Sequence, residues 1–200
     1  MKFLFSLLLI LTLVTSATAQ LSKVDFDDTD VVFYGIDFTA ARMIGSAGFS
    51  QPDSIVANFF DRWNSLLFIE QSKYDVAAGL NVTSVKYDLD PVQAHNKSVD
   101  PKTLVIDKSY TIDKDRVQEV ISDLDMSISD FDSGQGFIFV VESFDKTQSM
   151  SFVWCTVFDI ATKKVIATER FSGRAKGFGL RNYWGNTFRN VLKEVQGVTR

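Results

Sequence analysis

The chain carries two consecutive apolar runs, Gly136-Phe-Ile-Phe-Val-Val-Glu-Ser-Phe144 and Met150-Ser-Phe-Val-Trp-Cys-Thr-Val-Phe158. Neither run alternates cleanly between apolar and polar residues, which predicts two strands with both faces covered. The link Asp145-Lys-Thr-Gln148 is short enough for a hairpin turn, so the two strands should pair antiparallel. A third run, 165–171, follows another short link and alternates better, which predicts a strand nearer the edge of the same sheet.

Helices and further strands are predicted on both sides of these three strands. Apolar residues recur at helical spacing in several stretches, and β-branched or aromatic residues mark the strands. We expect strands at 31–38 and 81–87, a short one at 104–106, a long polar loop at 88–103, and helices at 50–71, 113–126 and 180–195. The predicted fold class is α/β with an α+β tendency: one mixed sheet of about five strands with three main helices packed on it, in the order β-α-β-α-β-β-β-α.

Composition indicates a globular protein and argues against several kinds of site. The 200 residues are 46% hydrophobic and 23% charged, with 3 prolines. One cysteine and one histidine are too few for a disulfide framework or a Cys/His zinc site. The net charge of −4 argues against nucleic acid, whose binding needs a basic face. We therefore expect no metal, no cofactor and no nucleic-acid partner.

The first residues match the three parts of a secretory signal peptide. Lys2 precedes the apolar run 3–14, and Ala17-Thr-Ala19 supplies a small-residue cleavage site. The apolar run is shorter than the about 20 residues that a membrane span needs, although an uncleaved anchor is the alternative. We expect a signal peptide at 1–19, a flexible acidic arm at 20–30 and a single α/β domain at 31–200. The protein should then be exported, periplasmic or secreted, with no membrane span after cleavage of the leader.

Some charged or reactive residues lie within apolar segments and need an explanation. Four carboxylates in or beside such segments either mark a site or form structural pairs. They are Asp37, Glu70, Glu142 and Asp159, and the candidate cations are Arg42, Lys73, Arg174 and Arg181. His95 stands in a polar stretch without a nucleophile motif, which favours an ordinary loop histidine. Cys155 lies inside an apolar strand, so we expect a buried, unreactive thiol.

Gly173-Arg-Ala-Lys-Gly-Phe-Gly-Leu-Arg-Asn182 joins the third strand to the last helix. Backbone N–H groups at a helix start can hold an anion. The candidate ligand-binding residues are therefore Lys176, Gly177, Gly179, Arg181 and Asn182. The structural alternative is a tight crossing in which Gly177 or Gly179 adopts a positive φ, and in which Arg181, in the first helical turn, pairs with a carboxylate.

Three short stretches carry a resemblance. Asp37-Phe-Thr-Ala-Ala-Arg42, Arg62-Trp-Asn64 and Gly177-Phe-Gly-Leu-Arg-Asn-Tyr-Trp184 are similar in wording to uncharacterised exported proteins of Bacteroidetes-type bacteria. The order of the elements resembles the amino-terminal domain of TolB and related envelope modules. The resemblance implies a place in the cell envelope and carries over no assigned chemistry.

The leading hypothesis for function is an exported, non-enzymatic binding or interaction module of the cell envelope. Its partner would be an envelope protein of unknown identity. The first alternative is a protein that binds a small apolar or anionic ligand, which requires a pocket with convergent polar groups. The second alternative is a hydrolase that uses two carboxylates facing each other across a cleft. Asn81-Val-Thr83 and Asn96-Lys-Ser98 also match the acceptor pattern for N-glycosylation.

Overall fold

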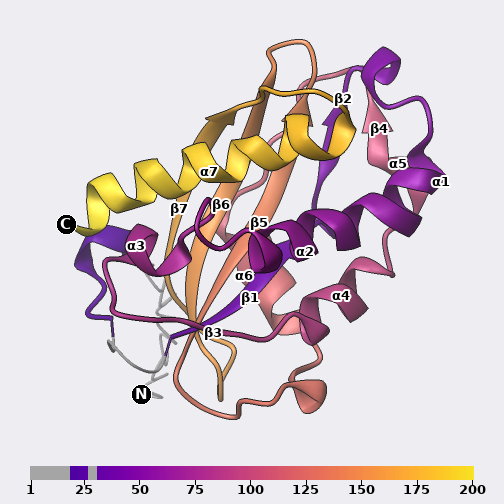
Figure 1. Cartoon of the computed structure of the whole chain (residues 1–200). Coiled ribbons are helices and arrows are strands. Elements are labelled where there is room, and N and C mark those ends of the chain that lie inside the picture. The colour runs from indigo at the N-terminus through magenta and orange to yellow at the C-terminus, as the bar shows by residue number, and fades with distance from the viewer. Residues whose placement is uncertain (1–18, 27–30) are drawn as a thin grey trace, which may run out of the picture.

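The computed structural model describes residues 19–26 and 31–200, and its centre is one mixed sheet (Figure 1). β5 (Gln135–Asp145), β6 (Met150–Asp159) and β7 (Val165–Arg174) are consecutive antiparallel strands, as their apolar runs predict. Among the strands of the described chain, β7 pairs only with β6, so its predicted position at the edge is confirmed. The mixed α/β class is likewise confirmed.

The parallel half of the sheet lies along the other edge of β5. β1 (Val31–Asp37) and β2 (Arg42–Ile44) pair with successive parts of β5, and the chain leaves the sheet between them. β3 (Lys86–Tyr87) and β4 (Val105–Ile106) extend this half by pairing with β1 and β2. The sheet in the described chain therefore has seven strands. The predicted number of about five is wrong because the parallel half is built from short, interrupted strands.

Helices cover both faces of the sheet. The α-helices are α1 (Pro52–Ser54), α2 (Phe60–Ile69), α3 (Val76–Leu80), α4 (Asp90–Asn96), α5 (Pro101–Leu104), α6 (Lys114–Asp123) and α7 (Leu180–Thr199). The shorter turns are η1 (Leu21–Lys23), η2 (Ser46–Gly48) and η4 (Met126–Ile128), while η3 (Ile55–Phe59) is a π-helical turn that joins α1 to α2.

The long loop predicted at 88–103 is wrong, because α4 and α5 lie there. Pro91 and Pro101, which suggested a loop, each stand in the first turn of a helix. A proline is tolerated there because the first N–H groups of a helix have no intrahelical partner. The Asp100 carboxylate also accepts a hydrogen bond from the Lys102 N–H and so caps α5.

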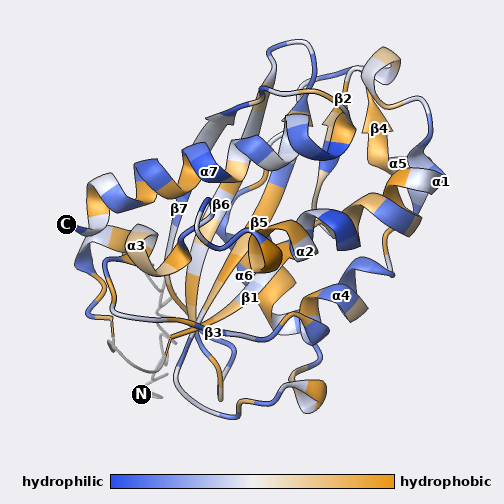
Figure 2. Ribbon diagram, viewed as in Figure 1, coloured by the Kyte–Doolittle hydropathy of each residue, from blue (hydrophilic) through white to orange (hydrophobic). Residues whose placement is uncertain are grey.

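The larger core lies between the sheet and the layer formed by α2, α3 and α7. Its centre is aromatic: the rings of Phe144 and Trp184 stack with centroids 4.6 Å apart, and those of Phe38 and Phe60 with centroids 4.2 Å apart. The smaller core lies on the opposite face, where α6 packs against residues of β1, β5 and β6. Figure 2 shows the central strands as mostly hydrophobic and α7 as banded, which fits a helix with one buried face.

Cys155 is buried within β6, as predicted. Burial raises the pKa of its thiol well above the ordinary range, and the charge of Glu169 acts in the same direction. A thiol held in its protonated form is a poor nucleophile. The prediction of a buried, inert cysteine is therefore confirmed for its burial, and its low reactivity follows from it.

The N-terminal prediction lies only partly within the described residues. The leader, except for Ala19, falls outside them. Residues 20–26 differ from the predicted loose arm, because Leu21 is fully buried in the larger core and Ala19 bridges to Ala167 of β7. Val24 and Phe26 also pack against this core, and the Leu21 N–H donates to the Glu169 carboxylate, so the segment is held by several contacts. Within the described chain, no helix has the length and apolar character required to span a membrane.

Gly173 fixes how closely the last helix approaches the sheet. A Cβ atom at this position of β7 would lie 2.4 Å from the backbone oxygen of Thr187 in α7. Only glycine allows this approach without moving the helix. The contact anchors α7 across β7 and so determines where the start of the helix lies relative to the hairpin between β5 and β6.

Candidate binding site at the start of the last helix

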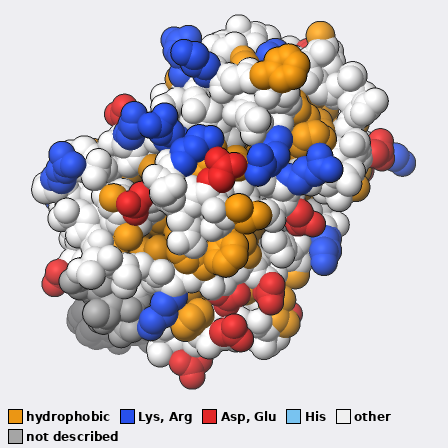
Figure 3. All heavy atoms as spheres, viewed as in Figure 1, with side chains coloured by type: hydrophobic (Ala, Val, Ile, Leu, Met, Phe, Trp, Pro, Cys, Tyr) orange, Lys and Arg blue, Asp and Glu red, His pale blue; other side chains and the backbone are white. Residues whose placement is uncertain are grey.

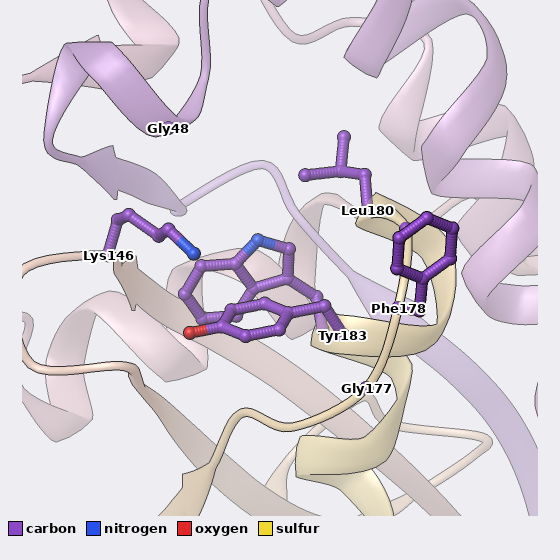
Figure 4. A pocket seen from close by; sticks show the side chains of 8 residues that line it. Gly48, Lys146, Gly177, Phe178, Leu180 and Tyr183 are labelled. Atoms are coloured by element: carbon purple, nitrogen blue, oxygen red, sulfur yellow. The ribbon is translucent and has the colours of Figure 1, made fainter.

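A pocket of about 320 Å³ lies where the start of α7 meets the β5–β6 hairpin (Figure 4). It is lined by Gly48, Lys146, Gly177, Phe178, Gly179, Leu180, Tyr183 and Trp184. Lys146 directly follows β5, and η2 with Gly48 lies just beyond the end of β2. The pocket therefore lies at the carboxyl ends of two parallel strands, which is where ligands bind in open α/β sheets.

Two glycines shape the wall on the helix side. Gly177 has a φ of 132° and Gly179 a φ of 74°, so the predicted positive φ is confirmed at both positions. Gly179 caps α7 but offers no side chain to its N–H groups, and the first turn contains no acidic residue. The partial positive charge at this helix end is therefore not offset by a carboxylate of its own first turn.

Lys146 brings a full positive charge to the same pocket. Its Nζ lies 3.9 Å from the centroid of the Tyr183 ring, and no carboxylate of the described residues lies within salt-bridge distance of it. The Tyr183 hydroxyl donates a hydrogen bond to Ser149 Oγ at 2.8 Å. The hydrogen bond to Ser149 lowers the pKa of Tyr183, and the nearby Lys146 contributes in the same direction. The tyrosine thus holds the lysine beside the pocket without neutralising it.

The indole of Trp184 forms part of the pocket wall. The side chain is fully buried, yet its Nε1 has no hydrogen-bond partner among the described residues. A buried donor without a partner costs about 1–3 kcal/mol. Nε1 itself is closed off from solvent, so this donor adds to the cost of the fold and is not in reach of a ligand unless the pocket wall moves.

The predicted site residues divide into two groups. Gly177 and Gly179 line the pocket, whereas Lys176, Arg181 and Asn182 do not. Arg181 instead pairs with Glu70 at 3.6 Å, and its backbone oxygen accepts a hydrogen bond from Trp63 Nε1 at 3.0 Å. These contacts tie α7 to α2, which is the structural role that the sequence offered as the alternative for Arg181.

The candidate residues from the sequence leave out six that line the pocket: Gly48, Lys146, Phe178, Leu180, Tyr183 and Trp184. Lys146 stands in a stretch predicted only as a hairpin turn, and Trp184 was counted as core. The exposed Phe178 between two glycines was the one local signal, because a large apolar side chain in a glycine-rich turn has no structural purpose of its own. Phe178 is 96% exposed at the rim of the pocket.

A second polar cluster closes the carboxyl end of β1. Asn64 of α2 bonds both the N–H and the carbonyl of Ile36, and Asn96 of α4 bonds the N–H of Phe38 and the same carbonyl. These amides complete hydrogen bonds that the sheet no longer supplies at the end of the strand. Asn96 is buried by this role, which argues against its use as a glycosylation acceptor.

His95 completes this cluster and is not the loop histidine that the sequence indicated. It lies in α4, and its Nδ1 is 2.7 Å from Oδ2 of the fully buried Asp37. Burial alone would lower the pKa of His95, but the hydrogen bond and charge of Asp37 outweigh it, so the pKa is raised above its ordinary value of 6.5. Asp37 Oδ1 is also bonded by the N–H and hydroxyl of Thr39. Each oxygen of this carboxylate thus has a partner.

The other carboxylates in apolar segments are also partnered. Glu142 accepts two hydrogen bonds from Arg170 and a third from Trp154 Nε1. Asp159 accepts from the N–H and hydroxyl of Thr162 in the β6–β7 turn. Of the predicted pairings, those of Glu70 with Lys73 and Arg181 are present. Arg42 does not pair with Asp37, since it bonds the carbonyl of Ala41 and lies over the Tyr110 ring.

Comparison with known protein families, with characterised proteins and with solved structures finds no match. Within the described chain, His, Cys, Asp and Glu side chains nowhere gather in threes that could hold a metal ion. The pocket offers one lysine, one tyrosine and a helix start whose first N–H groups have no side-chain cap. This set can bind an anionic group.

Proposed function

We propose that the protein is an exported, non-enzymatic binding module that holds an anionic group in the pocket beside Lys146. The observation that carries this proposal is that a full and a partial positive charge meet at the pocket, while no carboxylate of the described residues lies within salt-bridge distance of the full charge. One is the ammonium of Lys146, and the other is the start of α7. An anion placed between them gains from both, and the backbone N–H groups at a helix start suit carboxylate or phosphate oxygens.

The surroundings of the pocket support the same polarity. Figure 3 shows Lys and Arg side chains gathered in a band across the face that α7 covers. Although the whole chain carries a net charge of −4, this face presents positive charge to an approaching ligand. Export remains part of the proposal and rests on the leader at 1–19 and on the resemblance to envelope modules.

The partnered carboxylates favour binding over hydrolysis. Asp37 faces His95 and Glu142 faces Arg170, so neither of these two buried acids faces a second carboxylate across an open cleft. Carboxylate-dependent hydrolysis needs two acids on either side of the bond that is cleaved. A buried carboxylate is costly unless a cation pairs with it, so the pairs of Asp37 with His95 and of Glu142 with Arg170 fit a structural role for these two acids.

The test is to titrate the protein with inorganic phosphate by calorimetry and to compare Lys146→Gln with Lys164→Gln. Both lysines are exposed residues of hairpin turns, but only Lys146 lines the pocket. Loss of a charged hydrogen bond should weaken binding about tenfold or more for Lys146→Gln and leave Lys164→Gln unchanged. Absence of binding to the unmodified protein, or equal loss in both variants, would contradict the proposal.

A further inference from the structure

A second pocket adjoins the first one. It has a volume of about 250 Å³ and shares two lining residues, Gly48 and Leu180, with the pocket beside Lys146. Its other lining residues are Phe49, Ser50, Gln51, Ser54, Ile55 and Phe59. Because the two pockets share part of their walls, one ligand can occupy both.

The two pockets differ in chemistry. Figure 4 shows Lys146 on one side of the first pocket and Leu180 and Phe178 on the other side. Beyond Leu180, the wall of the second pocket includes Ile55 and Phe59 and contains no charged residue. Among the described residues that line the two pockets, charge therefore lies only at the Lys146 end, while the second pocket combines apolar residues with the uncharged Ser50, Gln51 and Ser54.

The wall of the second pocket is formed in part by an unusual turn. Ile55–Phe59 is a π-helical turn between α1 and α2, and both of its end residues line the pocket. π-helical turns are less favourable than α-helix and are frequent at functional sites. Here the turn widens the helix where the groove runs along it, and Phe59 remains only partly buried against the larger core.

Phe178 gives an independent indication of an apolar ligand. It is 96% exposed and stands between Gly177 and Gly179, both with positive φ. An isolated phenylalanine held out at the rim of a pocket gains free energy when an apolar body covers it. An inorganic anion in the first pocket would leave this ring in water.

Resting on the proposed function, we infer that the ligand is a monocarboxylate with an apolar body. Its carboxylate lies between Lys146 and the start of α7, and its apolar body passes Leu180 into the second pocket and against Phe178. The combined groove is in the size range of small-molecule sites. Two sources carry this chemistry: an acyl chain, and a peptide that ends in apolar residues with a free carboxylate.

The experiment compares acetate, octanoate, octanol and an acetylated Leu-Phe dipeptide as ligands of the full chain in calorimetry. Each buried methylene strengthens binding by about threefold to fourfold, so octanoate should bind at least about tenfold more tightly than acetate. Octanol should bind more weakly than octanoate, because it lacks the charge that Lys146 recognises. Whichever of octanoate and dipeptide binds more tightly identifies the source.

Variants test where the apolar body lies. Phe59→Ala should reduce octanoate affinity at least about threefold and leave phosphate affinity unchanged, because Phe59 does not line the pocket beside Lys146. The ring also contacts Trp63 and Arg62, so the fold of the variant is checked by its urea denaturation. Phe68→Ala is the matched control, since Phe68 lies in the following helix, is 50% exposed and lines neither pocket. Ser54→Phe, which fills the second pocket from its wall, provides a second variant with no core residue removed.

The outcomes separate this inference from the proposed function. If phosphate and acetate bind but octanoate binds no more tightly than acetate, the inference is overturned and the proposed anion site is retained. Octanol that binds as tightly as octanoate also overturns it. If phosphate, acetate and octanoate all fail to bind, the proposed function fails, and the inference fails with it. Octanoate affinity that both Phe59→Ala and Ser54→Phe leave unchanged places the apolar body elsewhere and overturns the inference.

Discussion

The carboxyl end of β1 and the carboxyl ends of β2 and β5 lie at the same side of the sheet, but the molecule treats them in opposite ways. At β1, Asn64 and Asn96 bond the strand end and His95 pairs with Asp37. At β2 and β5 the backbone is also bonded, for example by the Lys146 N–H to the Ile44 carbonyl. Among the described residues, however, the Lys146 ammonium has no carboxylate partner there and the start of α7 has no side-chain cap.

The difference shows why position in a fold does not by itself make a site. Strand ends in an α/β sheet expose backbone groups that either the protein or a ligand must satisfy. Side chains from α2 and α4 do this at β1, and neighbouring residues do it at β2 and β5, so what remains there for a ligand is the charge of Lys146 and the first turn of α7. We call the carboxyl end of β1 the closed end, and the carboxyl ends of β2 and β5 beside Lys146 the open end. The closed end contributes stability, and the open end is available for recognition.

The largest expected effect is on the closed end. Asn64→Ala removes the partner of the Ile36 N–H and one of the two donors to the Ile36 carbonyl, and it leaves a small cavity. We expect a loss of about 3 kcal/mol in the free energy of unfolding, measured by urea denaturation. Asn58→Ala is the matched control, because Asn58 is exposed and bonds only Ser54 within its own helical segment. If the two variants are equally stable, the hydrogen bonds of the Asn64 side chain to Ile36 do not contribute to stability.

The pair of His95 and Asp37 at the carboxyl end of β1 should make the stability of the protein depend on pH. Since the folded pKa of His95 is raised above 6.5, its charged pairing with Asp37 stabilises the fold fully below about pH 6.5, and this contribution is lost as the pH rises through the folded pKa. Asp123 and Arg116 of α6 act on the same ring in opposite directions.

His95→Gln should remove this pH dependence. The free energy lost in the variant, measured by urea denaturation, should be greater at about pH 5 than at about pH 9. His95 is the only histidine of the chain, so its titration can be followed directly by proton NMR. A loss that is the same at both pH values would contradict the assigned pairing.

A smaller effect is expected for Arg181, which lies beside the open end but is turned away from it. Its pair with Glu70 is about one third exposed on each side chain, so Arg181→Ala should cost less than about 1 kcal/mol of stability. Phosphate binding should remain within about twofold of the unmodified protein. If Arg181→Ala lost most of its phosphate binding while its stability was unchanged, Arg181 would belong to the binding site, and the role of Lys146 as the residue that binds the anion would be weakened.

The sequence was a good guide wherever structure is decided locally. The strands at 136–144 and 150–158 and the helix at 180–195 were predicted because apolar pattern and turn length lie within a short window. The short parallel strands β2, β3 and β4 depend on partners far along the chain, which no local pattern reveals. The prolines of α4 and α5 misled the prediction because the same residue serves loops and helix starts.

The site was only half predictable for the same reason. Gly177 and Gly179 indicate a backbone with positive φ, because glycine adopts this conformation without a steric cost. Nothing local connects Lys146 to Tyr183, since their contact requires α7 to cross the sheet at Gly173. Arg181 is the cation that the sequence places beside glycines, and only the packing of α7 against α2 turns it away from the pocket.

The most direct test of the contrast between the two strand ends is an NMR titration of isotope-labelled protein with octanoate. We expect shifts of the backbone N–H signals at Gly177, Gly179 and 180–183 and of the Trp184 indole N–H. We also expect unchanged side-chain amide signals of Asn64 and Asn96, which are already bonded. Shifts confined to Asn64, Asn96 and His95, with the start of α7 unmoved, would contradict this contrast.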